Sequence, residues 1–187
     1  MTATVYLGSS NGNDPKYCGN ARRLGTLLAQ AGIAVVFGGA GVGTMKSLAD
    51  GVLEAGGSLT GVMPGGFKGR KDYAEKGIDV RLNAPGLHFI ETPDMGTRIA
   101  TMENLSDVCI ILPGSHGTME EFFSYFVGIE LGRFDRKIAI LNTDGYYTPL
   151  LDLIRNMVRE GFSPQDDLSR LIVAATPEEL VEKLKEL

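Results

Sequence analysis

Short, continuous apolar runs alternate with segments of helical periodicity along the whole of this chain. Residues 33–37 (Ile-Ala-Val-Val-Phe) and 108–112 (Val-Cys-Ile-Ile-Leu) are apolar at every position, as is typical of strands covered on both faces in a parallel sheet. The stretch at residues 20–30 instead places Leu24 and Leu28 at helical spacing. Because helical crossovers join parallel strands, this alternation predicts an α/β fold: a Rossmann-like, doubly wound parallel sheet with helices on both faces.

The pattern predicts the position of each element and a single domain. Strands are expected at residues 4–7, 33–37, 60–63, 87–91, 108–112, 137–141 and 171–173, and helices at 20–30, 44–55, 94–105, 118–131, 146–160 and from Thr176 onward. Residues 65–86 lack periodicity and are expected to form a functional or mobile loop. The length of 187 residues and the absence of repeats or linkers predict one domain over residues 1–187.

Charge and composition argue against several classes of partner. The formal charge is −5, from 18 Lys and Arg against 23 Asp and Glu, which disfavours a nucleic acid or a membrane surface held by bulk charge. No apolar run approaches the ~20 residues of a transmembrane helix, and the start of the chain lacks the features of a signal peptide. Cys18 and Cys109 are too few for a disulfide framework or a zinc site. A cytoplasmic protein with free thiols and no metal is expected.

Three glycine-rich loops stand where predicted strands end and helices begin. They are residues 8–10 (Gly-Ser-Ser), 38–43 (Gly-Gly-Ala-Gly-Val-Gly) and 113–118 (Pro-Gly-Ser-His-Gly-Thr). In open parallel sheets ligands bind at such strand ends, and glycines let the unpaired N–H groups of the next helix approach an anion. Glycines also serve tight turns, but four in one six-residue loop favour phosphate binding. The loop is not a Walker A motif, and residues 57–59 lack the acid of a dinucleotide fingerprint.

Two carboxylates and an arginine stand near the third loop in sequence. Glu120 and Glu121 fall in the first turn of the predicted helix, where the helix dipole stabilises negative charge, so they either cap the helix or face a ligand. Neighbours on a helix point about 100° apart, so at most one of them should face the ligand. Arg98 either forms a solvated salt bridge or binds an anion.

Residues 113–121, Pro-Gly-Ser-His-Gly-Thr-Met-Glu-Glu, resemble the Pro-Gly-Gly-x-Gly-Thr-x-x-Glu motif of one enzyme family. This is the Lonely Guy family of cytokinin riboside 5′-monophosphate phosphoribohydrolases, formerly labelled lysine decarboxylase-like. Residues 95–98 resemble its Met-His-x-Arg-Lys element, and further matches occur in the same order at 8–10, 37–39, 106–107, 131–132, 142–151 and 161–162. The resemblance therefore covers nearly the full chain.

The resemblance implies a hydrolase that cleaves the N-glycosidic bond of an adenosine 5′-monophosphate, often N6-substituted, to a free base and ribose 5-phosphate. It makes Arg98 and Glu121 the catalytic pair and implies no metal or organic cofactor. Substrate and phosphate are expected to contact Gly8, Ser9, Gly38, Gly39, Gly43, Met95, Gly114, Ser115, His116, Gly117, Thr118 and Glu120. For His116, an exposed loop position is favoured over contact with the phosphate or the base. A homodimer is also expected, as in the family, through the aromatic helix that carries Phe122, Phe123, Tyr125, Phe126 and Ile129.

Several positions depart from the family pattern. Ile99 replaces a lysine beside Arg98, Gly96 replaces a histidine, and Ser115 replaces a glycine. Lys46 either restores the lost charge or is a solvated helix lysine. Ile99 and Ser115 support an alternative function: a non-catalytic nucleotide or molybdenum-cofactor carrier on the same scaffold. A decarboxylase is not expected, because such enzymes hold pyridoxal phosphate on a Schiff-base lysine and no loop pattern suggests that lysine.

Overall fold

The computed structural model describes residues 1–65 and 85–187, so most of the predicted 65–86 loop lies outside the described residues. In the described part the strands are β1 (Thr2–Tyr6), β2 (Ala34–Phe37), β3 (Leu59–Pro64), β4 (Leu87–Thr92), β5 (Val108–Ile111), β6 (Ile138–Leu141) and β7 (Leu171–Ala174). The α-helices there are α1 (Lys16–Gln30), α2 (Gly43–Glu54), α4 (Met95–Asn104), α5 (His116–Glu130), α6 (Thr148–Arg159) and α7 (Pro177–Leu184), with 3₁₀ turns η2 (Thr143–Gly145) and η3 (Gln165–Arg170).

All of these strands are parallel and form one sheet in the order β4-β3-β2-β1-β5-β6-β7. The order runs one way from β1 to β4 and the other way from β1 through β5 to β7, so it reverses at the β1–β5 pair. In that pair Val5 lies opposite Ile110 and Tyr6 opposite Ile111. The loops that follow β1 and β5 therefore emerge side by side from the carboxyl edge of the sheet.

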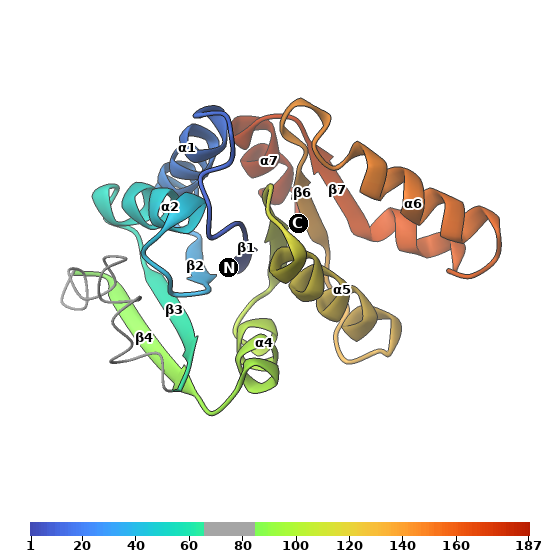
Figure 1. The fold of residues 1–187 in the computed structure, drawn as a ribbon, viewed down its shortest axis with the longest axis horizontal. Coiled ribbons are helices and arrows are strands. Elements are labelled where there is room, and N and C mark those ends of the chain that lie inside the picture. Colours follow the sequence, from blue (N-terminus) through green and yellow to red (C-terminus); the bar gives the residue numbers. More distant parts are fainter. Residues whose placement is uncertain (66–84) are drawn as a thin grey trace.

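Helices cover both faces of the sheet, as Figure 1 shows. On one face, α1, α2 and α7 pack on alternate strand residues such as Val5, Val35 and Ile110. On the other face, α4, α5 and α6 pack on the intervening residues, among them Tyr6 and Ile111. The prediction of a doubly wound parallel sheet is confirmed. Its physical basis is the run of consecutive apolar residues in each central strand, since both faces of such a strand need a cover.

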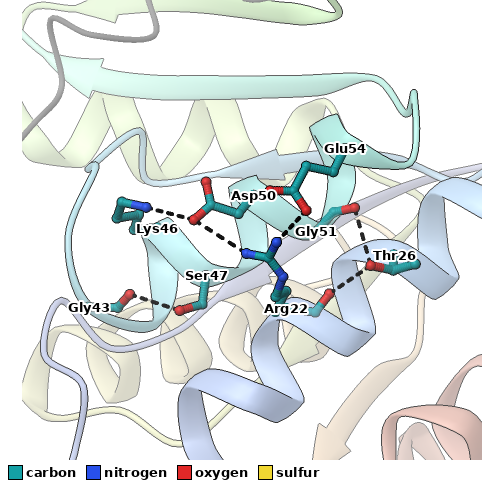
Figure 2. Close-up of polar contacts among 8 residues, drawn as sticks. All are labelled: Arg22, Thr26, Gly43, Lys46, Ser47, Asp50, Gly51 and Glu54. Carbon is teal, nitrogen blue, oxygen red and sulfur yellow. Dashed lines mark hydrogen bonds and ion pairs between the residues drawn. The ribbon is translucent and has the colours of Figure 1, made fainter.

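Two glycines allow α1 and α2 to pack backbone against backbone. A methyl group at Gly51 would overlap the carbonyl of Arg22, and one at Gly25 would overlap the carbonyl of Leu48. The hydroxyl of Thr26 lies 3.2 Å from the Arg22 carbonyl oxygen and 3.3 Å from that of Gly51, as seen in Figure 2. This close contact fixes α2, and with it the loop that precedes α2 at the carboxyl edge of the sheet.

The predicted starts of α1, α5 and α6 are wrong, and local contacts decide those of α1 and α6. Helix α5 begins at His116 rather than residue 118. Helix α1 begins at Lys16 rather than residue 20, since the side chain of Asp14 accepts a hydrogen bond of 2.9 Å from the Lys16 N–H. Helix α6 begins at Thr148 rather than residue 146, after a turn in which Asp144 has φ 48°. Helix α7 starts as predicted, with Thr176 accepting a hydrogen bond from the Glu179 N–H.

The aromatic residues of α5 mostly belong to the core of this chain. Phe122, Tyr125, Phe126 and Ile129 are buried against the sheet and α6, so these four side chains are not available for the dimer contact expected through this helix. Phe123 stays partly exposed. Over residues 1–65 and 85–187, none of the helices has the length and apolar character needed to cross a membrane.

Candidate active site

A cavity of about 200 Å³ opens at the carboxyl edge of the sheet, where the strand order reverses. Its walls come from the ends of β1, β2 and β3 and from the amino-terminal turns of α2, α4 and α5. The lining residues are Leu7, Ser9, Gly38, Ala40, Met45, Met63, Pro64, Met95, Arg98, Ser115, Gly117, Thr118 and Glu121. Ligands of doubly wound sheets bind at this position, so the cavity is the candidate active site.

Arg98 and Glu121 form a buried ion pair that lines this cavity. The Nη1 atom of Arg98 donates a hydrogen bond of 2.8 Å to Oε1 of Glu121, and each residue is 5% exposed. They come from two helices that both point their amino-terminal ends at the cavity, α4 and α5. Asp94 caps α4 by accepting a hydrogen bond from the Thr97 N–H at 2.8 Å, which fixes the start of the helix that carries Arg98.

The backbone of two strands holds the guanidinium of Arg98 in place. Its Nε atom donates a hydrogen bond of 3.0 Å to the carbonyl of Val62 in β3. Its Nη2 atom lies against Gly38, just after β2, so closely that a methyl group on Gly38 would overlap it. Glycine at position 38 therefore leaves room for the arginine. The guanidinium is held on three sides, by Val62, Gly38 and Glu121.

Glu121 has an unusual environment for a carboxylate. Burial raises its pKa above the ordinary value, and the charge and hydrogen bond of Arg98 offset part of that effect. Only its Oε1 atom is bound to Arg98, and Oε2 has no hydrogen-bond partner within residues 1–65 and 85–187. The pair therefore offers a negative oxygen, in a site largely shielded from water, to a positive charge that develops on a substrate.

The β5–α5 loop forms the rim beside Glu121. Ser115, Gly117 and Thr118 line the cavity, and the first helical hydrogen bond of α5 runs from the Met119 N–H to the Ser115 carbonyl. The backbone N–H groups before Met119 have no helical partner, which suits an anion. His116 and Glu120, also expected at the site, have exposed side chains and are not among the lining residues.

Several known proteins are similar to this sequence over most of its length. The family model described as "Possible lysine decarboxylase" matches residues 45–184. A probable cytokinin riboside 5′-monophosphate phosphoribohydrolase from Oryza sativa subsp. japonica is 36% identical over 182 residues, 97% of this chain and 71% of the relative. The cytokinin riboside 5′-monophosphate phosphoribohydrolase of Rhodococcoides fascians is 37% identical over 172 residues, 92% of this chain and 83% of that protein. The chain belongs to the Lonely Guy family.

Solved structures share the fold of this Lonely Guy protein at lower identity. A molybdenum cofactor binding protein from Rippkaea orientalis superposes with a TM-score of 0.70 and 21% identity, covering 99% of this chain and 95% of that one. The molybdenum cofactor carrier protein of Chlamydomonas reinhardtii superposes with a TM-score of 0.69 and 18% identity, covering 100% of this chain and 96% of that one. At these identities the likeness is one of fold.

The β2–α2 loop borders a second, larger cavity of about 670 Å³, which shares Ser9 and Ala40 with the first. Its walls are Ser9, Ser10, Asn11, Ala40, Gly41, Val42, Gly43, Lys46 and Ser47. Lys46 lines this second cavity and binds Asp50 at 2.7 Å, as Figure 2 shows, and it does not line the cavity of Arg98. Lys46 therefore does not replace, at the cavity of Arg98, the lysine that the family pattern has where this chain has Ile99.

Besides Gly38, four of the expected phosphate-binding glycines pack against protein atoms in this Lonely Guy protein. A methyl group at Gly39 would overlap the side chain of Met63, and one at Gly43 would overlap the backbone of Ser9. A methyl group at Gly8 would lie 3.4 Å from the Pro113 carbonyl. Gly39 and Gly43 also have φ values of 78° and 58°, which side-chain-bearing residues seldom adopt. Gly114 is also closely packed, because a methyl group there would overlap the side chain of Thr118.

Five lining residues were not predicted from the sequence: Leu7, Ala40, Met45, Met63 and Pro64. Together with Met95 they make the walls around the ion pair largely apolar. Leu7, Met63 and Pro64 could have been found, because they stand at or directly after the carboxyl end of a predicted strand, where ligands bind. Met45 carries no such signal, since its position at the cavity depends on how α2 packs on the sheet.

Proposed function

We propose that this chain hydrolyses the N-glycosidic bond of adenosine 5′-monophosphate, or of its N6-substituted forms, to the free base and ribose 5-phosphate, as in cytokinin activation. Its whole length would act as one nucleotide-binding domain. The relatives' name supports the substrate class, and the single observation that carries the proposal is the buried Arg98–Glu121 pair in the cavity at the β1–β5 edge.

The chemistry asks for a negative group beside the sugar. As the bond from C1′ to the base breaks, its electron pair leaves with the base and positive charge builds on the ribosyl carbon. The free Oε2 of Glu121 would stabilise that charge and orient the water that adds to C1′. The water loses a proton as it adds, and the departing base gains one. Arg98 keeps Glu121 ionised and in place, which explains why the arginine is bound so firmly.

The shape of the site fits a ligand that extends past the ion pair. A cavity of about 200 Å³ is smaller than the roughly 300–1,000 Å³ of most ligand pockets. We therefore place the ribose at Glu121, the phosphate at the N–H groups of Ser115 to Thr118, and the base beside Met63 and Met95. Apolar walls give the base hydrophobic contact, and the amino-terminal end of α5 favours the phosphate dianion.

The carrier alternative has less support than the hydrolase. The likeness to molybdenum-cofactor proteins is one of fold, at 21% and 18% identity. Relatives at 36–37% identity bear the phosphoribohydrolase name. A buried carboxylate with a free oxygen also suits the positive charge that develops on the sugar during glycosidic cleavage.

We further propose that the protein is a cytoplasmic homodimer. An apolar surface remains on α5 and the segment after α6, where Val127 is 42%, Leu131 72% and Phe162 88% exposed. A shallow groove of about 220 Å³ between Phe123, Met157 and Phe162 lies within it. Apolar surface of this kind is typical of a subunit interface. Light scattering at micromolar concentration should give twice the 20.0 kDa chain mass, and a monomer mass would contradict the proposal.

The test of the function is direct. Purified protein is incubated with AMP and, separately, with N6-isopentenyl-AMP, and base and ribose 5-phosphate are followed by chromatography beside Glu121→Ala. Release by the wild type that the substitution abolishes supports the hydrolase, and the ratio of the two rates gives the base preference. Tight binding of either nucleotide without release would favour the carrier.

A further inference from the structure

The segment between β6 and α6 turns the chain back toward the β5–α5 loop. Asp144 (φ 48°) and Gly145 (φ 77°) are both left-handed, and the Asn142 side chain accepts a hydrogen bond of 2.7 Å from the Tyr147 N–H. Aspartate is one of the few side-chain-bearing residues that tolerate a left-handed backbone, so it suits this turn. As a result Tyr146 and Tyr147 stand together ahead of α6, with ring centroids 4.9 Å apart in an edge-to-face arrangement.

The hydroxyl groups of these two tyrosines bind the backbone of the β5–α5 loop. Tyr147 donates to the carbonyl of Leu112 at 2.6 Å, and Tyr146 donates to the carbonyl of Gly114 at 2.6 Å. The two carbonyls flank Pro113, in the short connection from the end of β5 to the start of α5. The Leu112–Pro113 and Gly114–Ser115 peptide planes are therefore fixed from outside the cavity.

The bond to Gly114 sets the direction of a neighbouring N–H group. The Gly114 carbonyl and the Ser115 N–H belong to the same trans peptide, so they point in opposite directions. Because the hydroxyl of Tyr146 holds the carbonyl, the Ser115 N–H points away from the tyrosine. Ser115 lines the cavity, and its N–H is one of those that we place at the phosphate.

The tyrosines are themselves supported by the start of α1. The ring of Tyr17 lies edge-on to Tyr146, with centroids 6.0 Å apart. The ammonium of Lys16 bridges Asp14 at 3.1 Å and Asp144 at 2.7 Å, which favours the left-handed turn. Tyr147 is 3% exposed, and burial raises its pKa well above the usual range, so its hydroxyl remains a donor at any assay pH.

We propose that Tyr146 and Tyr147 are positioning residues of the active site, whose hydroxyls hold the β5–α5 loop so that the Ser115 N–H and the first turn of α5 face the substrate phosphate. Neither tyrosine lines the cavity, so both act through the loop. The inference rests on the proposed function for the identity of the ligand, a sugar phosphate.

The test compares ligands with and without the phosphate. Tyr146→Phe, Tyr147→Phe and the double variant are titrated with ribose 5-phosphate and with adenosine by calorimetry, and KM and kcat are measured with AMP. Each lost hydroxyl is expected to weaken ribose 5-phosphate about fivefold, and the pair about twentyfold, with adenosine unaffected. KM for AMP should rise in parallel while kcat changes less.

Tyr17→Phe is the matched control. It removes a hydroxyl from the same cluster that donates no hydrogen bond within the described residues, and it keeps the ring that supports Tyr146, so ribose 5-phosphate should bind as in the wild type. Affinity for ribose 5-phosphate within twofold of wild type in both single variants would overturn the proposal, as would equal weakening of adenosine.

The two proposals fail in different ways. A wild type that does not hydrolyse AMP contradicts the proposed function, while the phosphate titrations still decide the role of the tyrosines. If Tyr147→Phe does not fold, as its melting curve would show, Tyr146→Phe alone carries the test, because that side chain is 43% exposed.

Discussion

Two glycine-rich loops reach the same edge of the sheet and use their glycines in different ways. In the β2–α2 loop, glycine occurs where another group leaves no room for a side chain: Gly38 against Arg98 and Gly43 against Ser9. In the β5–α5 loop, Gly114 is packed in the same way against Thr118, but a methyl group on Gly117 would meet no atom within 4 Å, and Gly117 lines the cavity. A glycine-rich sequence therefore marks close packing as readily as it marks a bound anion.

The loops also differ in what holds them. Packing of α2 on α1 fixes the β2–α2 loop, through Gly25 and Gly51. The β5–α5 loop instead depends on two tyrosine hydroxyls from a segment more than 30 residues further along the chain. We infer that the first loop positions Arg98 and that, under the proposed function, the second binds the phosphate.

The largest effect is expected at the carboxylate that follows the β5–α5 loop. Glu121→Gln should lower kcat for AMP about 10³-fold, because the amide cannot stabilise the positive ribosyl carbon. Glu120→Gln changes the adjacent, exposed glutamate and should cost far less. Base release under single-turnover conditions measures both. Equal losses in the two variants would contradict the assignment of Glu121.

A methyl group in the β2–α2 loop should lower kcat without changing the affinity for the phosphate. Gly38→Ala would displace the guanidinium of Arg98, and a shift of about 1 Å at a catalytic group can cost about 10²-fold in kcat. Affinity for ribose 5-phosphate should stay near that of the wild type.

Gly19→Ala is the matched control for Gly38→Ala. Position 19 lies on α1 where a methyl group meets nothing within 4 Å, so this change should raise stability by about 0.5–1 kcal/mol and leave kcat unaltered. If Gly38→Ala instead weakened ribose 5-phosphate binding and left kcat unchanged, the roles assigned to the two loops would be reversed.

The pH profile should identify the ionised group on the β5–α5 side. Because burial raises the pKa of Glu121, the catalytic carboxylate is lost as pH falls through a value above the ordinary ~4.3 of glutamate. The acid limb of kcat/KM should therefore have its midpoint above 4.3. Glu120 raises the pKa of Glu121, so Glu120→Gln should move that midpoint to lower pH. A midpoint at or below 4.3 would argue against Glu121.

The smallest effect is expected from the lysine beside the β2–α2 loop. Lys46 lines the second cavity, not that of Arg98, and its half-exposed side chain binds Asp50. Lys46→Ala should therefore change KM and kcat for AMP by less than about threefold, the size of effect usual for an ion pair with an exposed partner. A tenfold rise in KM would show instead that the substrate phosphate lies at the β2–α2 loop, and the comparison of the two loops would fail.

The sheet could be predicted from sequence because the apolar residues of each strand indicate which of its faces are buried. Residues 33–37 and 108–112 are apolar throughout, and the fold that covers them on both faces follows. The starts of α1 and α6 could not be predicted, since they depend on single contacts such as the hydrogen bond from the Lys16 N–H to the Asp14 side chain. Patterns of hydrophobicity carry no information about such contacts.

The candidate site was predictable only in part. Arg98 and Glu121 lie 23 positions apart, and the family motif, rather than any spacing rule, joined them before the structure placed them 2.8 Å apart. The role of Gly38 beside Arg98, and of Tyr146 beside Gly114, could not be predicted. Both contacts arise from strand order and loop packing, which bring distant segments together.

The burial of the Arg98–Glu121 pair has a consequence for how the protein responds to ionic strength. Counterions screen exposed charges over about 8 Å at physiological salt, and they act far less on groups enclosed by protein. The pair is 5% exposed, whereas Ser115 and Gly117 on the rim are open to solvent. Added salt should therefore weaken binding of the substrate phosphate at the rim and leave the electric field of the ion pair at C1′ almost unchanged. Phosphate affinity and the rate of bond cleavage should then differ in their dependence on ionic strength.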